Sequence, residues 1–176
     1  MLTRLREGTP DAARGGRATA GTPDAAGAPV RVQGAGHSFG QLRAIERIDL
    51  EASPGEVVGL VGPSGCGKTT LLELVAGLRQ PDAGTIAVGG QAGPAERLER
   101  CAYMPQRDLL LPWLSAVDNA ALALRVAHVP RREARARAVA HFERLGLAGF
   151  ENSRPDQLSG GMRQRVAFLR TLMAGR

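Results

Sequence analysis

Hydrophobic residues in the first half of the chain form short runs separated by glycine and proline. Runs rich in valine, isoleucine and leucine predict strands at residues 30–32, 45–50, 56–61, 85–88 and 101–104. The run at 56–61 is almost continuously apolar, which is typical of a strand buried on both faces. An apolar helix is expected at 71–77, where a glycine ends it. Strands alternating with helices indicate an α/β fold.

The second half of the chain has a helical pattern. Between residues 114 and 145 apolar side chains recur every three or four positions, with a break at Pro130 and a stop at Gly146. A last helix is expected from Met162 to Ala174, after a loop at residues 153–157. We therefore expect a helical insertion after the first strands and helices.

The densest basic cluster lies at residues 131–137, within this helical segment. It fits two interpretations, a phosphate-binding stripe or the solvated face of a helix. We favour the solvated face, because the positions three and four residues apart on the opposite side are apolar: Ala134, Ala138, Phe142 and Leu145.

Residues 1–28 form a leader of a different composition. It is rich in glycine, alanine, threonine, proline and arginine, and the hexapeptide at 8–13 recurs at 21–26. Such a segment has few large apolar side chains to bury, so we expect it to be disordered. The folded domain is expected to begin at residue 29.

Composition narrows the class of protein. The chain has 176 residues and a formal net charge of +6, and 43% of its residues are hydrophobic, which is enough for a core. No apolar run approaches the roughly 18 residues that cross a bilayer, and no secretory signal follows the N-terminal Met, so we expect a cytosolic chain. The spacing of Cys66 and Cys101 suits neither a disulfide framework nor a zinc site. All basic residues except Lys68 are arginines, which we attribute to compositional bias and not to nucleic-acid binding.

The segment between the strand at 56–61 and the following helix fits the phosphate-loop pattern G-x-x-x-x-G-K-[ST]. Its residues and the next one are the candidate nucleotide-binding set: Gly62, Pro63, Ser64, Gly65, Cys66, Gly67, Lys68, Thr69 and Thr70.

The chemistry of a triphosphate explains these residue types. Glycines let successive backbone N–H groups surround a phosphate, and the start of the helix favours an anion. Lys68 supplies a positive charge for the β- and γ-phosphates, and the Thr69 hydroxyl is a hard oxygen ligand for Mg²⁺. The sequence thus predicts binding of ATP with Mg²⁺. Cys66 is either a thiol with a lowered pKa or, as we prefer, simply a small residue.

A second anion site is expected at the last helix. Ser159 is a suitable N-cap, and Gly160 and Gly161 expose backbone N–H groups at the helix start. One triphosphate rarely needs two anion sites from the same chain. Two chains arranged head to tail use both, because the second site of each chain can face the nucleotide held by the phosphate loop of the other.

Together these motifs resemble the ATP-binding subunit of ABC transporters, over about residues 30–175, with residues 158–165 resembling the family's signature motif. The resemblance implies an α/β P-loop NTPase core with an N-terminal antiparallel β subdomain and a helical subdomain. Its expected boundaries are 29–105 for the phosphate-loop core and β subdomain, 106–160 for the helical subdomain and 161–176 for the signature helix. It also implies a sandwich dimer in which each signature faces the nucleotide held by the other chain.

Three further positions gain a role from the resemblance. Gln106 is similar to the family's Q-loop glutamine, which offers its oxygen to Mg²⁺ or to the attacking water. Phe39 lies where the family places an aromatic ring that stacks on adenine, although a core role stays open. Trp113 is either a core residue or part of the surface that docks on the membrane-spanning partner.

The family's Mg²⁺-binding aspartate, its catalytic glutamate and its later histidine are not found before the chain ends at Arg176. We therefore expect a truncated piece in which the C-terminal part of the core sheet is missing. Without the neighbouring strand, residues 57–61 would have an unpaired apolar edge, so this polypeptide alone is expected to aggregate and to turn over no ATP.

The resemblance implies the energy-coupling subunit of an importer, most similar to the nitrate, sulfonate and taurine group. The expected partners are a second copy, membrane-spanning permease subunits and, indirectly, a periplasmic or lipid-anchored solute-binding protein, with no nucleic acid. The expected location is peripheral, on the cytoplasmic face of the cell membrane. Two alternatives stay open: an ABC-type ATPase that acts on nucleic acid or ribosomes, and a non-hydrolytic nucleotide-binding module.

Overall fold

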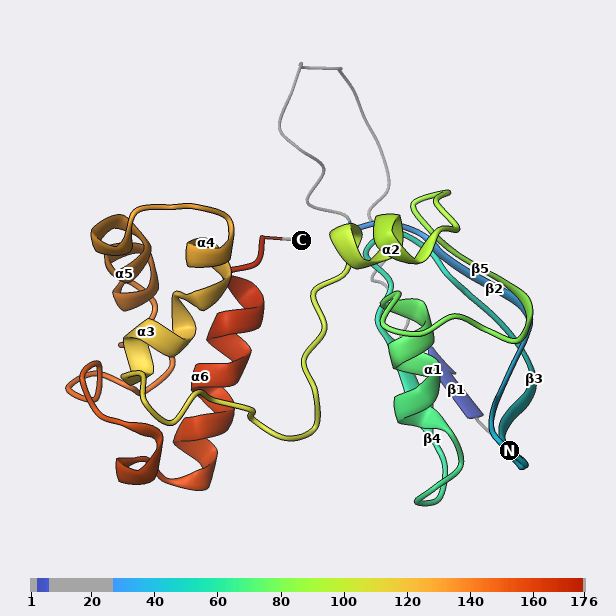
Figure 1. The fold of residues 1–176 in the computed structure, drawn as a ribbon, viewed down its shortest axis with the longest axis horizontal. Helices are drawn as coiled ribbons and strands as arrows, with labels where there is room; N and C mark the ends of the chain where they lie inside the picture. Colours follow the sequence, from blue (N-terminus) through green and yellow to red (C-terminus); the bar gives the residue numbers. More distant parts are fainter. Residues whose placement is uncertain (1–2, 7–26, 176) are drawn as a thin grey trace, which may run out of the picture. The chain divides into compact units, whose positions relative to one another are not determined.

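The computed structural model describes residues 3–6 and 27–175. The chain divides into two compact units, Met1–Cys101 and Ala102–Arg176, each with a hydrophobic core of its own (Figure 1). Apart from residues 3–6, 27 and 28, the leader predicted to be disordered lies outside the described residues.

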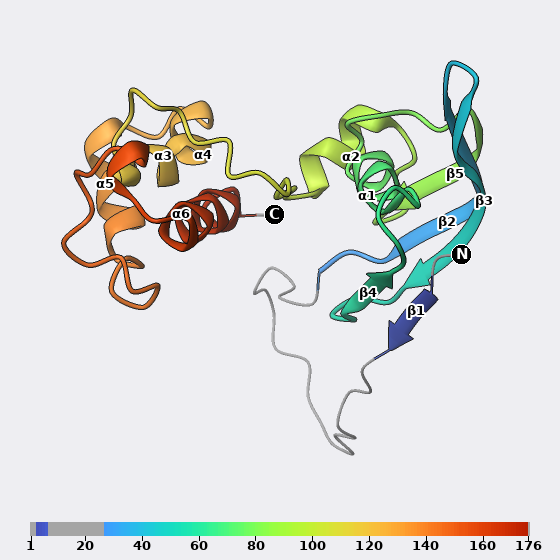
Figure 2. The same cartoon turned by 90° about the horizontal axis from the view of Figure 1, so that it is seen from below.

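The first unit contains a three-stranded antiparallel sheet in the order β3-β2-β5 (Figure 2). Its strands are β2 (Val30–Phe39), β3 (Leu42–Ala52) and β5 (Ala83–Val88). A two-residue turn joins β2 to β3, so Phe39 pairs with Leu42. These strands include the predicted runs at 30–32, 45–50 and 85–88, which are confirmed.

The core of this unit lies between the sheet and helix α1 (Lys68–Val75). Leu71 and Leu74 of α1 are buried in one cluster with the sheet residues Val32, Ile45 and Ile86. Apolar residues alternate along the strands and recur every three to four positions on the helix, so both elements present one apolar face to this core. Gly77, with a φ of 79°, follows the helix as predicted.

Strand β4 (Val58–Val61) leads into the phosphate loop and pairs antiparallel with β1 (Thr3–Arg6). The prediction of disorder is therefore wrong for residues 3–6, because the unpaired backbone of β4 provides hydrogen-bonding partners for a neighbouring strand. The predicted burial of β4 is also wrong, since residues 58–60 are half-buried and Val61 is 49% exposed. Among the described strands β1 is its one hydrogen-bonded neighbour.

Helix α2 (Pro94–Arg100) closes the first unit and carries a buried cation. Arg97 is 2% exposed, and its guanidinium donates hydrogen bonds to the backbone carbonyls of Arg79, Ile86 and Ala92. Burial lowers the pKa of Arg97, but an arginine keeps its charge even so. Arg97 thus ties α2 to β5 and to the turn that precedes it.

The predicted strand at 101–104 is wrong, because these residues have no regular structure and pair with none of the described strands. A run of β-forming residues becomes a strand only when a neighbour completes its backbone hydrogen bonds.

The second unit is helical. Its elements are α3 (Ala116–Ala120), α4 (Leu122–Val126), α5 (Arg131–Val139), the 3-10 helix η1 (Pro155–Gln157) and α6 (Gly160–Leu172). The helical pattern, its break at Pro130 and its stop at Gly146 are confirmed, although residues 140–145 form turns and not helix.

Helix α6 is the longest helix of this unit and packs against α3 and α4 (Figure 1). Its residues Val166, Ala167 and Leu169 are buried in one cluster that also contains alanines of α3 and α5, Phe142 and Leu147. Small alanine side chains let these short helices approach closely, so the low aromatic content of the chain still produces a packed core.

Candidate functional site

The phosphate loop connects β4 to the start of α1 in a shape that requires glycine. Gly65 and Gly67 have φ angles of 80° and 94°, in the left-handed region that other residues seldom adopt. At Gly67 a side chain is also excluded by contact, since an added Cβ would lie 2.7 Å from the carbonyl oxygen of Ala44. The loop is therefore pressed against β3, and its curvature is set by the backbone.

Lys68, the first residue of α1, turns its ammonium group back over the loop. Its Nζ donates hydrogen bonds to the carbonyl oxygens of Gly62, at 2.8 Å, and Pro63, at 2.7 Å, and lies 3.5 Å from Cys66 Sγ. The side chain is half-buried, so its charge is held at the mouth of the loop. The structure thus brings together the loop residues that the sequence predicted and places the chain's only lysine among them.

The start of α1 is open to an anion. Gly67 is its N-cap, and no side chain caps the helix. The amide groups of the first turn have no partner within the helix, and they include those of Lys68, Thr69 and Thr70. Left-handed glycines, uncapped amides and one ammonium group form the donor set that suits a polyphosphate.

The donor set also fits Mg²⁺ held jointly with a phosphate. Among the described residues no group of three or more His, Cys, Asp and Glu side chains could hold a metal ion alone. Thr69 is exposed on the first turn of α1, where its hydroxyl is available as a hard oxygen ligand. Magnesium characteristically binds through one or two protein oxygens together with substrate phosphates, which matches this arrangement.

Phe39 ends β2 at the hairpin of the first unit and is 41% exposed. The guanidinium carbon of Arg79 lies over the ring, 4.9 Å from its centroid, and the ring of His37 meets it edge-on. Asp82 holds this hairpin, because its Oδ2 accepts a hydrogen bond of 2.7 Å from the Ser38 amide. Asp82 Oδ1 also lies 3.3 Å from His37 Nδ1, close enough for an ion pair but not aligned as a hydrogen bond. Phe39 is therefore a half-exposed ring in a polar setting, outside the core cluster of its unit.

Gln106 lies in the second unit, on a loop that is hydrogen-bonded to side chains of α6. Its side chain is exposed, and its backbone carbonyl accepts a hydrogen bond of 3.1 Å from Gln164 Nε2. Residues 106–110 and Gln164 line a cavity of about 470 Å³. Sequence reasoning identified Gln106 but missed the residues of α6 that hold its loop.

The start of α6 confirms the predicted cap. Ser159 is the N-cap, and its Oγ accepts a hydrogen bond of 3.3 Å from the Met162 amide. Gly161 has open space around it, because an added Cβ would meet no atom within 4 Å. The two glycines thus leave their own backbone amides uncovered, while the third amide of α6, that of Met162, is bonded to Ser159.

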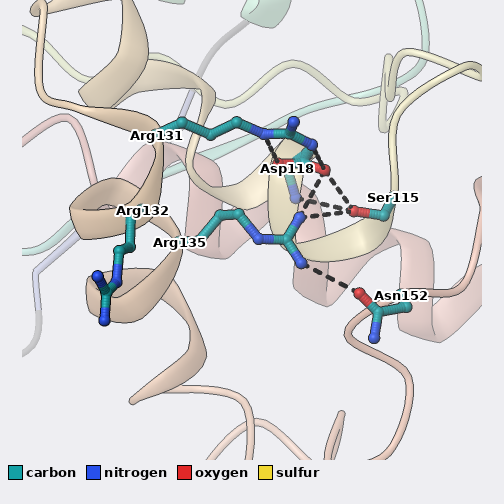
Figure 3. A pocket seen from close by; sticks show the side chains of 6 residues that line it. All are labelled: Ser115, Asp118, Arg131, Arg132, Arg135 and Asn152. Atoms are coloured by element: carbon teal, nitrogen blue, oxygen red, sulfur yellow. Dashed lines mark hydrogen bonds and ion pairs between the residues drawn. The ribbon is translucent and has the colours of Figure 1, made fainter.

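The basic cluster at 131–137 forms a polar pocket with α3 (Figure 3). Arg131 and Arg135 both reach Asp118, at 3.0 Å and 2.6 Å, and Ser115 also donates a hydrogen bond to that carboxylate. Burial raises the pKa of Asp118, but hydrogen bonds from Arg131, Arg135 and Ser115 outweigh it and bring the pKa down to about 2. Asn152 accepts a further hydrogen bond from Arg135.

The ion pairs of Asp118 with Arg131 and Arg135, here called the clamp, decide between the two interpretations of the basic cluster. Ala134 and Ala138 are buried in the core, as the solvated-face interpretation predicts, while two of the arginines are occupied by Asp118. Sequence reasoning missed the clamp, although serine three residues before aspartate at the start of a helix is the signal of a polar helix cap.

The segment after Gln106 is apolar and exposed. Trp113 is 69% exposed and Leu109 is 52% exposed, so the interpretation of Trp113 as a core residue is wrong. The buried side-chain amide of Asn119 fixes the segment around Trp113 through hydrogen bonds with the backbone of residues 111, 114 and 115. An exposed tryptophan on a fixed loop is a common anchor for a partner protein.

In the described part of the chain, no helix combines the length and the apolarity that crossing a membrane would require.

Comparison with known proteins identifies the family. The family profile described as ABC transporter matches residues 45–176. The formylaminopyrimidine import ATP-binding protein ThiZ of Halalkalibacterium halodurans is 43% identical over 129 residues, covering 73% of this chain and 49% of the relative. The taurine import ATP-binding protein TauB of Chromobacterium violaceum is 48% identical over 136 residues, covering 76% of this chain and 50% of the relative.

A third relative extends the range of systems. The lipoprotein-releasing system ATP-binding protein LolD of Bacteroides thetaiotaomicron is 38% identical over 152 residues, covering 82% of this chain and 70% of the relative. The chain spans about half the length of the import proteins that it matches.

A solved structure supports the same family. The ATP-binding cassette MJ0796, solved as a dimer bound to ADP and Pi, matches with a TM-score of 0.72 and 28% sequence identity, over 83% of this chain and 70% of that chain. The predicted α/β ATPase fold is confirmed by this likeness. With sequence, fold and phosphate loop in agreement, the chain belongs to the ABC transporter family.

Proposed function

We propose that this chain is the ATP-binding, energy-coupling part of an ABC importer. The observation that carries the proposal is the phosphate loop, in which Lys68 Nζ sits over left-handed glycines at an uncapped helix start. The importer assignment is supported by the names of the import proteins at 41–48% identity. In the intact protein, binding and hydrolysis of ATP would drive a permease.

Each residue has a separate role in this proposal. The backbone amides of Gly65, Gly67 and α1 hold the polyphosphate, and Lys68 neutralises its charge. Thr69 and Gln106 supply oxygen ligands for Mg²⁺, which when bound reduces the negative charge of the phosphates. Phe39 stacks on the base through the part of its ring that Arg79 leaves free.

The signature segment would complete the site of a second copy. The uncovered amides at Ser159, Gly160 and Gly161 form an anion site of their own, which is supported by the open start of α6. A head-to-tail dimer would place this site on the nucleotide of the other chain. The dimeric state of the solved cassette MJ0796 is in line with this arrangement.

Leu109 and Trp113 would form the contact with the permease, at the cytoplasmic face of the membrane. Their exposure supports this role, and Asn119 fixes the backbone on both sides of Trp113. The proposed cargo is a small solute of the taurine or formylaminopyrimidine type, since these are named for the import relatives. A solute-binding protein would contact the permease and not this subunit.

The test is Lys68→Met in the full-length protein that carries this sequence. Loss of a charge-assisted contact to phosphate costs about 1.5–3 kcal/mol, so ATP affinity should fall by roughly 10- to 100-fold. Uptake of labelled taurine and formylaminopyrimidine by cells should fall with it. Arg132→Met, which removes an exposed charge from α5, is the matched control and should change neither. Unchanged ATP affinity in Lys68→Met would overturn the proposal.

A further inference from the structure

One face of α6 carries three polar side chains that reach back to residues 106–109. Arg163 Nε lies 3.1 Å from Asp108 Oδ2, and Gln164 donates to the Gln106 carbonyl. Arg170 donates two hydrogen bonds, of 2.7 Å to the Asp108 carbonyl and 2.9 Å to the Leu109 carbonyl. Arg163 and Arg170 are seven residues apart, which places them on the same side of the helix.

The loop has a shape that needs external support. Leu109 has a φ of 46°, in the left-handed region that costs a residue other than glycine on the order of 1–3 kcal/mol. Its side chain is exposed and contributes little to the core. The two carbonyls that Arg170 binds lie on either side of Leu109, so this guanidinium holds the backbone dihedrals of the strained residue.

Arg163 links the loop to the residue before the signature serine. Its Nη1 donates a hydrogen bond of 2.8 Å to the Leu158 carbonyl, while its Nε contacts Asp108. Asp108 in turn accepts a hydrogen bond of 3.3 Å from the Leu110 amide. A continuous polar path therefore joins Leu158, next to the start of α6, to the loop that carries Gln106.

We propose that Arg163, Gln164 and Arg170 are positioning residues that fix Gln106 to the signature helix α6. Gln106 and the signature amides at the start of α6 then move as one body. This inference rests on the proposed function, in which Gln106 is a ligand of Mg²⁺. In this proposal the three side chains of α6 orient Gln106, in addition to stabilising the helical unit. Burial lowers the pKa of Arg170, yet the side chain stays charged and keeps both bonds.

The first experiment measures the loop directly, without enzymatic activity. Arg163→Met and Arg170→Met in the full-length protein should speed amide hydrogen exchange in the peptide that contains Leu110 and Leu111 by roughly tenfold. Arg132→Met, an exposed arginine of α5, is the matched control and should leave that exchange unchanged. Unchanged exchange in both α6 variants would overturn the positioning role.

The second experiment separates positioning from a purely structural role. Groups that orient a metal ligand typically change metal affinity or activity 10- to 100-fold when removed, so the half-saturating Mg²⁺ concentration for ATP hydrolysis should rise by about tenfold. ATP binding measured without Mg²⁺ should stay at the wild-type value. Faster loop exchange with an unchanged Mg²⁺ dependence would show a structural role alone and would overturn the proposal.

The ion pair provides an internal check. If Arg163 acts through Asp108, then Asp108→Asn combined with Arg163→Met should raise the half-saturating Mg²⁺ concentration no more than one substitution does. Additive effects would overturn that link.

If Arg170→Met fails to fold, Arg170→Lys, which can reach only one of the two carbonyls, and Arg163→Met carry the test. Wild-type protein that binds no ATP would instead refute the proposed function, while the exchange measurement would still judge the loop.

Discussion

At the scale of single residues, glycine in the phosphate loop avoids two different costs, backbone strain at a positive φ and a steric clash of a side chain. Gly65 and Gly67 are both left-handed, but only Gly67 is pressed against the backbone of Ala44. Gly67→Ala should therefore combine a strained backbone with a steric clash, whereas Gly65→Ala should show the strain alone, about 1 kcal/mol.

Thermal denaturation should show a larger fall in Tm for Gly67→Ala than for Gly65→Ala. ATP binding by Gly67→Ala should also be lost, because relief of the clash moves the loop away from β3. Equal effects of the two substitutions would show that the contact with Ala44 does not shape the loop.

The Asp118 carboxylate makes stability depend on pH. Its folded-state pKa is about 2, below the ordinary value of 3.8, so its ionised form is favoured in the folded chain. This stabilisation is present above about pH 4 and is lost as the pH falls through about 2. Urea unfolding should therefore show the free energy of unfolding declining over this window, and Asp118→Asn should flatten the decline.

At neutral pH, Asp118→Asn should lower the free energy of unfolding by about 1–2 kcal/mol, because Arg131 and Arg135 lose a charged acceptor. Asp156→Asn, at an exposed position in the 3-10 helix η1, is the control and should keep the wild-type pH profile. An identical pH profile for wild type and Asp118→Asn would refute the role of the clamp.

The residues of the phosphate loop could be predicted because their requirement is local. Left-handed glycines and one lysine at the start of a helix are encoded within nine consecutive positions. The ion pairs of Asp118 with two arginines and the contacts of Arg170 could not be predicted, because these partners lie 13 to 62 residues away and are brought together only by the packing of α3, α5 and α6. Long-range polar contacts leave no periodic signal in a single sequence.

At the scale of elements, two helices of the second unit begin with the same device. Ser115 caps α3 and Ser159 caps α6, and each hydroxyl accepts a hydrogen bond of 3.3 Å from the amide three residues later. Replacing a serine cap with alanine costs about 1 kcal/mol, so Ser159→Ala and Ser115→Ala should both lower the free energy of unfolding. Ser115→Ala should cost more, because its hydroxyl also binds Asp118.

Comparing Ser159→Ala with Ser115→Ala distinguishes an effect of lost helix capping from an effect on nucleotide binding. In the full-length protein Ser159→Ala should weaken ATP-dependent dimerisation, measured by light scattering, whereas Ser115→Ala should leave it unchanged. Equal loss of dimerisation in both variants would mean that stability alone explains the effect of Ser159.

The elements also show where sequence patterns fail. The helices of the second unit followed their periodic pattern up to residue 139, since most of their backbone hydrogen bonds lie within the element, although residues 140–145 form turns and α2 was not predicted. The strand predicted at 101–104 did not form, and β4 gained a neighbour from residues 3–6, because strands depend on partners that the local pattern does not name.

At the scale of the whole molecule, the two anion sites lie in different compact units. Lys68 belongs to the first unit and Ser159 to the second. In the proposed head-to-tail dimer each nucleotide is held by Lys68 of one chain and Ser159 of the other. If one chain lacks Lys68 and the other lacks Ser159, one of their two shared sites has lost both residues and the other is intact.

This arrangement predicts complementation. Full-length Lys68→Met and full-length Ser159→Ala should each show little ATP turnover alone. A mixture in equal amounts should form mixed dimers with one intact site, which random pairing limits to about one quarter of the wild-type number of sites. ATP turnover of the mixture should rise toward that fraction, and light scattering should detect the ATP-dependent dimer.

A control mixture keeps the test specific. Lys68→Met combined with Lys68→Met,Ser159→Ala has no intact site in any pairing, so it should show no recovery. If each nucleotide were bound by Lys68 and Ser159 of the same chain, the first mixture would contain no intact site either. Absence of recovery in the first mixture, with mixed dimers demonstrated by differently tagged chains, would therefore exclude the shared-site arrangement.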